Sequence, residues 1–175
     1  MMDLWEAIKE RRSIRRYVQG RDVSSETVEQ LLQAAMAAPS AGNCQPWHFV
    51  VVRDPETQQG LAEAAYGQRF VAQAPVVIVV CADPARSAAR YSRRGSELYC
   101  LQDTAAATEN ILLGVTALGL GACWVGAFDE RAAATVLELP PHLRPVAMIP
   151  IGHPGERFAR RTSRRPLSEM TTFIE

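Results

Sequence analysis

The stretch from Ser96 to Phe128, SELYCLQDTAAATENILLGVTALGLGACWVGAF, constrains the fold more than any other part of the chain. Its apolar residues recur at alternating spacings of three and four, the period of one face of an α-helix. Small and apolar residues also occupy the other faces, and a helix that is apolar nearly all round is a buried helix. We therefore expect a long buried central helix with Ser96 as N-cap and Gly119 as its stop. A short buried strand at 122–125 should follow.

Helices and short apolar runs alternate along the rest of the chain. Capping residues predict helices after Asp3, after Ser24 or Ser25, and after Asp54 and Asp129. Apolar runs predict strands at 47–53, 76–81 and 146–151, the first buried on both faces, and MTTFI at 170–174 could add another. A polar segment should span 83–95. We expect an α+β fold with three α/β/α layers, a small central mixed sheet and one domain over residues 1–175.

Composition narrows the classes of protein that the chain can belong to. Apolar residues make up 47% of the sequence, and no apolar run approaches the roughly 20 residues that a membrane helix needs. The N-terminus is typical of an amphipathic helix rather than a signal peptide. The four cysteines form no CxxC motif, which favours reduced thiols. These features predict a cytoplasmic protein with no membrane partner, and the net charge of zero argues against nucleic-acid binding.

Arginines cluster near both ends of the chain, at 11–16 and at 157–165. One interpretation is two solvated ends with local salt bridges. The other is that both ends meet at one anionic group. The sequence ERRSIRRY places a serine hydroxyl among guanidinium groups, and guanidinium forks bind phosphate in bidentate fashion.

The loop PSAGNCQPW offers a second candidate binding element. Ser40, Asn43 and Gln45 supply neutral donors and acceptors on a backbone that proline and glycine make irregular. Such groups suit the edge of a heteroaromatic ligand. The alternative is an ordinary helix-to-strand loop whose polar side chains satisfy its own backbone.

Motifs for acid–base or nucleophilic catalysis are absent from the sequence: it contains no GxSxG, HExxH or P-loop pattern. His48, His142 and His153 stand in contexts typical of structural histidines. An enzyme without catalytic side chains of its own usually depends on a cofactor.

Six motifs together give the chain a family resemblance. RRSIR, PSAGNCQPWHF, QDTAAATENILL, GLGACWVGAF, IPIGHPGE and RRPLSEM occur in the order seen in the nitroreductase family, and they span essentially the whole chain. The chain resembles a compact member of that family. The resemblance implies a homodimeric FMN-dependent oxidoreductase that takes electrons from NAD(P)H. It also implies ping-pong transfer to a small acceptor such as a nitroaromatic or a quinone.

The resemblance also assigns site residues on one subunit. Arg11, Arg12 and Ser13 match the residues that hold the FMN phosphate and ribityl chain, and Arg15 matches the basic residue near flavin N1 and O2. Gln68 and Arg69 resemble the segment at the pyrimidine end. The loop against the isoalloxazine, with a backbone N–H facing N5, corresponds to Trp124, Val125, Gly126 and Ala127.

Other matches lie at the dimer interface and in the C-terminal tail. The loop that the other subunit contributes corresponds to Pro39, Ser40, Ala41, Asn43 and Gln45. Arg164 matches the C-terminal phosphate arginine. Thr162 replaces a frequent lysine, so Arg161 or Arg165 would substitute for it. Gly126 replaces a glutamate found in some members, which makes the pocket floor less polar and leaves the acceptor open.

Three alternatives remain at this stage. The chain could bind flavin without turnover, as a reservoir, sensor or trafficking partner. It could be a specialised flavoenzyme of the same fold, such as a reductive dehalogenase or a flavin-fragmenting enzyme, although the short stretch at 83–97 argues against a large lid. It could also be an arginine-rich structural domain that binds no ligand.

Overall fold

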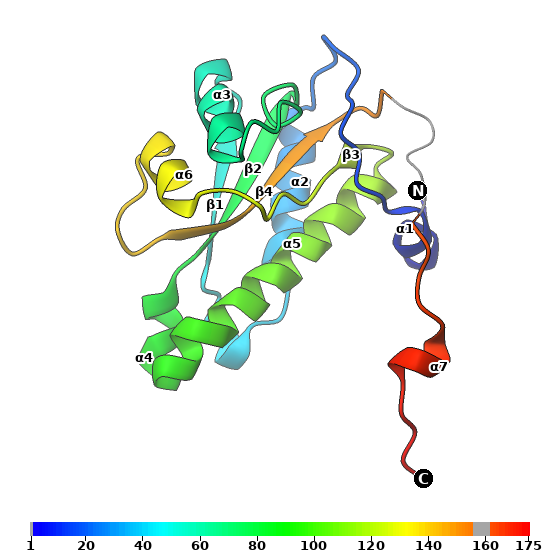
Figure 1. The fold of residues 1–175 in the computed structure, drawn as a ribbon, viewed down its shortest axis with the longest axis vertical. Helices are drawn as coiled ribbons and strands as arrows, with labels where there is room; N and C mark the ends of the chain where they lie inside the picture. Colours follow the sequence, from blue (N-terminus) through cyan, green and yellow to red (C-terminus); the bar gives the residue numbers. More distant parts are fainter. Residues whose placement is uncertain (1, 156–161) are drawn as a thin grey trace.

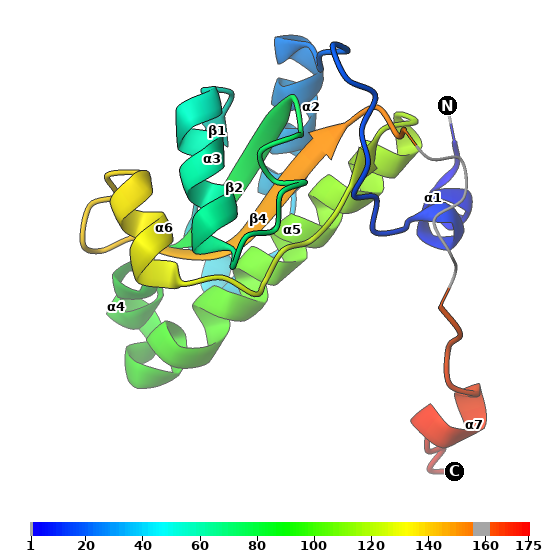
Figure 2. The ribbon, with the colours of Figure 1, turned by 45° about the horizontal axis from the view of Figure 1, so that its top comes forward.

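The fold is a three-layer α/β/α arrangement, and the computed structural model describes residues 2–155 and 162–175 of it. Helices α2 (Ser25–Met36) and α5 (Cys100–Ala117) cover one face of a four-stranded sheet. Helices α3 (Pro55–Ala64) and α6 (Glu130–Val136) cover the other face, as Figures 1 and 2 show. The predicted α+β class and its layers are therefore confirmed.

The sheet has the strand order β1-β2-β4-β3. Its strands are β1 (Trp47–Val52), β2 (Val76–Ala82), β3 (Gly121–Ala122) and β4 (Arg144–Gly152). Each neighbouring pair is antiparallel. We expected a mixed sheet. In the described residues, parallel pairing is limited to an isolated bridge between Ser13 and Ala122.

Strand β2 is completely buried, because successive side chains enter the two different cores. Ile78 and its same-face neighbours pack with α2 and α5, whereas Val79 and its neighbours pack with α3 and α6. Strand β1 has an equally apolar sequence but a different environment. Among the described strands it pairs with β2 alone, and Val51 is 38% exposed, so the prediction that β1 is buried on both faces is wrong. Hydrophobicity alone does not distinguish an edge strand from a central one.

The central helix α5 has the predicted length and burial but begins differently. Ser96 is not its N-cap, because the Ser96 hydroxyl donates to the Arg93 carbonyl at 3.1 Å. A π-helical turn (Gly95–Tyr99) leads directly into α5 and occupies the backbone groups that a cap would satisfy. Before it, the expected polar segment forms helix α4 (Pro84–Arg94), whose N-cap Asp83 accepts from the Arg86 N–H.

The two ends of the chain lie outside the layers. Helix α1 (Leu4–Glu10) begins at the predicted cap Asp3, which accepts from the Glu6 N–H at 2.9 Å. Residues 170–174 do not form the expected strand: Met170 ends helix α7 (Leu167–Met170), and 171–175 run on without pairing to any described strand. Figure 1 shows α7 away from the sheet, where no strand lies beside it. No helix in the described ranges is long and apolar enough to cross a membrane.

Candidate functional site

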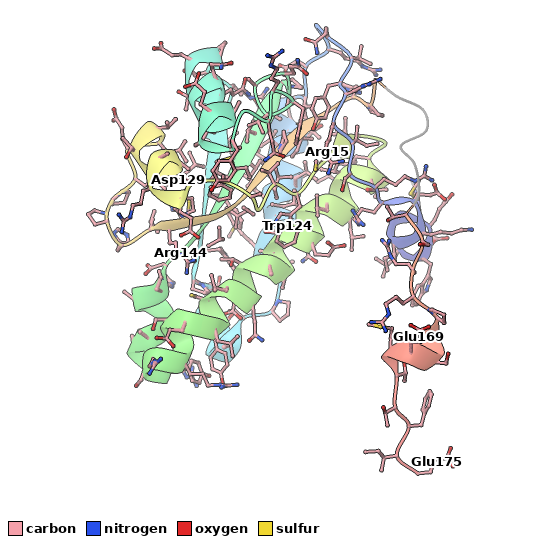
Figure 3. The ribbon with its side chains drawn as sticks, in the orientation of Figure 1. Arg15, Trp124, Asp129, Arg144, Glu169 and Glu175 are labelled. Carbon is pink, nitrogen blue, oxygen red and sulfur yellow. The ribbon has the colours of Figure 1, made fainter. Side chains whose placement is uncertain are left out.

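The N-terminal arginine segment joins the strand that follows α5. Ser13 and Ala122 form a parallel bridge, and the Ile14 N–H donates to the Ala122 carbonyl at 2.8 Å. Gly121 permits this approach, because a Cβ there would lie 2.8 Å from Cγ2 of Ile14. The structure thus brings together two of the predicted binding segments, residues 11–15 and 121–127. Figure 3 labels Arg15 and Trp124 on these two segments.

The three arginines of this segment differ in their surroundings. The Arg12 guanidinium binds Glu10 at 2.6 Å, whereas the Arg11 guanidinium is 3.8 Å from the half-exposed Glu109 carboxylate. Arg15 is exposed and lies over the ring of Phe70, 5.7 Å from its centroid. Arg11 therefore has only a long ion pair with Glu109, and the described contact of the Arg15 guanidinium is with an aromatic ring.

Cys123 lies next to these residues and was not among the predicted site residues. Burial raises the pKa of its thiol, while Arg15 and the Ser13 hydroxyl, both close to the sulfur, act in the opposite direction. The thiol is therefore protonated at neutral pH. Phe70, beneath the Arg15 guanidinium, was also missed. The signal for Cys123 was its place inside GLGACWVG, whereas nothing in the sequence links Phe70 to Arg15.

The segment 124–127 forms a second side of the site. Backbone hydrogen bonds with Met148 in both directions hold Val125, and they leave Trp124 39% exposed. Gln68 donates to the Ala127 carbonyl at 3.1 Å. The structure therefore brings Gln68 to the predicted 124–127 segment. Three further predicted residues are exposed: Arg69, Gly126 and Ala127.

The loop 39–45 lies elsewhere in the same chain. Its short 3₁₀ turn (Ala41–Asn43) contacts the first turns of α5, where Asp103 accepts from the Ala41 N–H at 3.1 Å. Ser13 and Ala122 lie beyond the last turn of α5. At about 1.5 Å per residue, the helix separates Asp103 from its C-terminal end at Leu118 by roughly 22 Å. The predicted loop residues, Pro39, Ser40, Ala41, Asn43 and Gln45, therefore lie near one end of α5 and Ser13 lies near the other, whereas Arg11 reaches Glu109 in the middle of the helix.

The tail arginines make contacts within the tail. The Arg164 guanidinium donates to the Thr162 hydroxyl at 3.0 Å, and Arg165 pairs with Glu169 at 3.1 Å. The structure gives no contact between these two side chains and residues 11–15. Arg161, the other candidate to replace the missing lysine, lies outside the described residues.

The arrangement at residues 11–15 and 121–127 suits an anion next to a flat group. It offers guanidinium groups and a serine hydroxyl on one side and an exposed indole with small residues on the other. No group of three or more His, Cys, Asp or Glu side chains in the described structure could hold a metal ion. The four cysteines are free, as expected.

Comparisons with known proteins agree with this fold. The sequence profile of the Nitroreductase family matches residues 8–69 and 63–153. A protein of Archaeoglobus fulgidus, provisionally named NADH dehydrogenase/NAD(P)H nitroreductase, is 42% identical over 160 residues, which cover 89% of this chain and 88% of its own. The "NADH dehydrogenase" of Thermus thermophilus is 36% identical and covers 89% of both chains.

Solved structures give the same result. The crystal structure of a nitroreductase family protein from Clostridium novyi superimposes with a TM-score of 0.80 at 32% identity, over 89% of this chain and 87% of that one. The helical layers and the small antiparallel sheet are therefore those of the α+β nitroreductase fold. The chain belongs to the nitroreductase family.

Proposed function

We propose that this protein is an FMN-dependent oxidoreductase that transfers electrons from NAD(P)H to a small acceptor, such as a nitroaromatic or a quinone. The names of relatives support this proposal. The Thermus thermophilus relative is named an NADH dehydrogenase. A Bacillus subtilis relative, 29% identical over 181 residues, is named an FMN reductase [NAD(P)H].

The observation that carries the proposal is the pairing of residues 11–15 with the strand after α5. It places two guanidinium groups and the Ser13 hydroxyl next to the 121–127 segment. These donors fit a terminal phosphate, because guanidinium groups make charge-assisted hydrogen bonds to phosphate oxygens. The weakly paired Arg11, 3.8 Å from Glu109, can turn to an anion at little cost.

When bound, FMN supplies a redox centre that accepts and returns two electrons. Arg11, Arg12 and Ser13 would bind its phosphate and ribityl chain, with Arg164 or Arg165 adding charge from the tail. Arg15 would place a positive charge beside the ring system, where a fixed charge stabilises negative charge as it develops.

The flat part of the cofactor would contact the second side of the site. Val125 fixes the backbone of this segment through its two bonds with Met148, and the exposed Trp124 and Gly126 lie at its surface. Gln68 and Arg69 would lie at the pyrimidine end, next to Ala127. Donor and acceptor would then use the same open side in turn, which is the basis of a ping-pong mechanism.

We further propose a homodimer in which each site receives the loop 39–45 from the partner subunit. The position of that loop, near the N-terminal end of α5, supports this arrangement, because Ser13 of the same chain lies beyond the opposite end of that helix. Exposed apolar side chains supply an interface. Leu4, Trp5 and Ile8 of α1 are 60%, 78% and 47% exposed, and the tail adds four more large apolar residues.

The visible spectrum of the purified protein tests the cofactor directly. We expect the absorption of bound oxidised flavin, and we expect heat to release FMN rather than FAD, since the arginines converge on a terminal phosphate. Oxidation of NADH and NADPH with a quinone acceptor then tests turnover. Parallel lines in double-reciprocal plots would support ping-pong transfer. A colourless protein that takes up no added FMN would contradict the proposal.

A further inference from the structure

The loop 40–45 has an unusual backbone. Gly42, Asn43 and Gln45 all have φ between 50° and 56°, in the left-handed region. Residues other than glycine rarely adopt this region, and each that does costs free energy that the surrounding structure must offset. The loop's own bonds include the Gln45 N–H to the Ser40 hydroxyl at 2.9 Å. Two other elements also hold it.

Asp103 is the first support. It lies on α5, its side chain is 7% exposed, and one carboxylate oxygen accepts from the Ala41 N–H at 3.1 Å. The other oxygen is buried and has no hydrogen-bond partner in the described part of the chain. Burial raises the pKa of this carboxyl. A carboxyl group buried with one oxygen unpaired is unfavourable for folding, so stability does not explain why it occupies this helix.

Helix α4 is the second support. The Arg90 guanidinium donates to the Gly42 carbonyl at 2.9 Å, and the Arg86 guanidinium donates to the Cys44 carbonyl at 2.6 Å. The contact is close: a Cβ on Gly42 would lie 2.5 Å from the Tyr91 hydroxyl. Bonds from a charged donor to a carbonyl are stronger than neutral ones. Two side chains of α4 therefore fix the Gly42 and Cys44 carbonyls of the loop.

We propose that Asp103 and Arg90 are positioning residues of the flavin site, which hold loop 40–45 in its left-handed shape from two different helices. In this shape Ser40, Asn43 and Gln45 are presented as a fixed set of neutral hydrogen-bonding groups. The inference rests on the proposed function, because it assigns that set to the cofactor. It gives α4 a role in cofactor binding although α4 carries none of the residues that match the family motifs.

Two pairs of matched variants test the inference. Arg90→Ala removes the bond to Gly42, and Arg93→Ala is its control, since Arg93 lies on the same helix but pairs with Glu97 in an i,i+4 ion pair. Asp103→Ala removes the acceptor for the Ala41 N–H. Asp103→Asn keeps an acceptor oxygen on a side chain of nearly the same size. If the asparagine variant keeps the properties of wild type and the alanine variant loses them, the hydrogen bond to Ala41 matters and not only the volume of the side chain.

The first readout is hydrogen–deuterium exchange of the amides at 41–45 in the protein freed of flavin. We expect exchange to accelerate about tenfold in Arg90→Ala and Asp103→Ala, and to stay within about threefold of wild type in Arg93→Ala and Asp103→Asn. The second readout is the Kd for FMN from flavin fluorescence. We expect it to rise about tenfold in the first two variants, as for the loss of one such bond.

The outcomes separate this inference from the proposed function. If wild-type protein binds no FMN, the proposed function fails, and the assignment of the loop to the cofactor fails with it. If wild type binds FMN and Arg90→Ala binds it equally well with unchanged exchange, the inference alone is overturned. Should Asp103→Ala not fold, Arg90→Ala against Arg93→Ala decides, because both arginines are exposed.

Discussion

Ser13 lies opposite Ala122 in a parallel β-bridge, and the next residue, Ile14, donates its N–H to the Ala122 carbonyl at 2.8 Å. This one pairing joins the start of the chain to the end of its central helix. It also places Ser13 and Arg15 beside the Cys123 sulfur. The arginine-rich segment is therefore fixed by backbone contacts rather than by its own charges.

Gly121→Ala should damage both stability and the site. The added Cβ would lie 2.8 Å from Cγ2 and 2.9 Å from Cβ of Ile14, so the 13–15 segment must move. Overpacking of this kind costs about 1–3 kcal/mol of the free energy of unfolding. Urea denaturation measures that loss, and a weaker affinity for FMN should accompany it.

Gly126→Ala is the matched comparison for stability. Its Cβ would meet nothing closer than Nε1 of Trp124 at 3.6 Å, which is ordinary contact. We expect the free energy of unfolding to change by less than about 0.5 kcal/mol. Equal losses of the free energy of unfolding in the two variants would show that the contact with Ile14 is not the reason why alanine at position 121 destabilises the fold.

The layers of this fold could be predicted from the sequence because periodicity records burial. The apolar stripe of α5, the continuous apolar run of β2 and the caps Asp3, Ser24 and Asp54 all appear as expected. Each of these signals is local, and each depends on a side chain's own position in a helix or strand.

Features that depend on distant partners could not be predicted in this way. Val51 is exposed on β1, which is an edge strand of the described sheet, and the sequence of β1 does not reveal its place in the strand order. The role of Asp103 depends on Ala41, far away in the chain. The one local signal was a carboxylate within a mainly apolar helix, a feature that Glu109 of the same helix shares. The candidate site itself came from family motifs, and the structure adds the contacts between them.

Arg15→Ala should lower the midpoint potential of bound flavin. Arg15 is exposed, its guanidinium lies over Phe70, and its positive charge would favour the negative charge that a reduced flavin carries. Arg164→Ala should instead weaken FMN affinity with little effect on the potential, because it would act at the phosphate. Redox titration of both variants measures this. A shift in Arg164→Ala alone would mean that the two roles are reversed.

The buried thiol of Cys81 should weaken the fold at alkaline pH. Burial raises its pKa to about 12, from an ordinary value of 9.0. Between pH 9 and 12 the unfolded chain loses this proton and the folded chain keeps it, so stability falls as pH rises. Below pH 9 the thiol is protonated in both states and contributes no pH dependence. The expected slope is about 1.4 kcal/mol per pH unit from this group.

Cys81→Ala isolates that contribution from the other groups that titrate in the same range. The variant loses packing at every pH, but its free energy of unfolding should fall less steeply between pH 9 and 12 than that of wild type. Urea titrations at several pH values give the two slopes. Identical slopes would contradict the assignment to Cys81.

Removal of residues 166–175 should weaken the proposed dimer. The tail exposes Leu167, Met170, Phe173 and Ile174 by 73%, 63%, 78% and 96%, and water-exposed apolar side chains gain free energy when a second subunit covers them. The truncation keeps Arg164 and Arg165. Analytical ultracentrifugation should show a shift toward monomer, whereas the control Ser168→Ala should sediment as wild type. A truncated protein that remains fully dimeric would place the interface elsewhere.

The shared site can be tested by complementation between two defective subunits. Arg11→Ala should abolish or strongly weaken FMN binding through the phosphate, and Asn43→Ala should do so through the loop near the other end of α5. In a homodimer with shared sites, a mixed dimer holds one site built from two intact segments and one site damaged twice. Random assembly gives about half mixed dimers, so roughly a quarter of wild-type sites should return.

The measurement is flavin content per subunit after coexpression of the two variants with different affinity tags. Tandem purification on both tags isolates the mixed dimers, in which half of the sites should bind FMN, about one flavin per dimer. Each variant expressed alone is the control and should stay colourless. Flavin in the mixed dimers would show that Asn43 serves the partner's site, because only then does a mixed dimer hold one intact site. Verified mixed dimers without flavin would mean that Arg11 and Asn43 serve one site from a single chain.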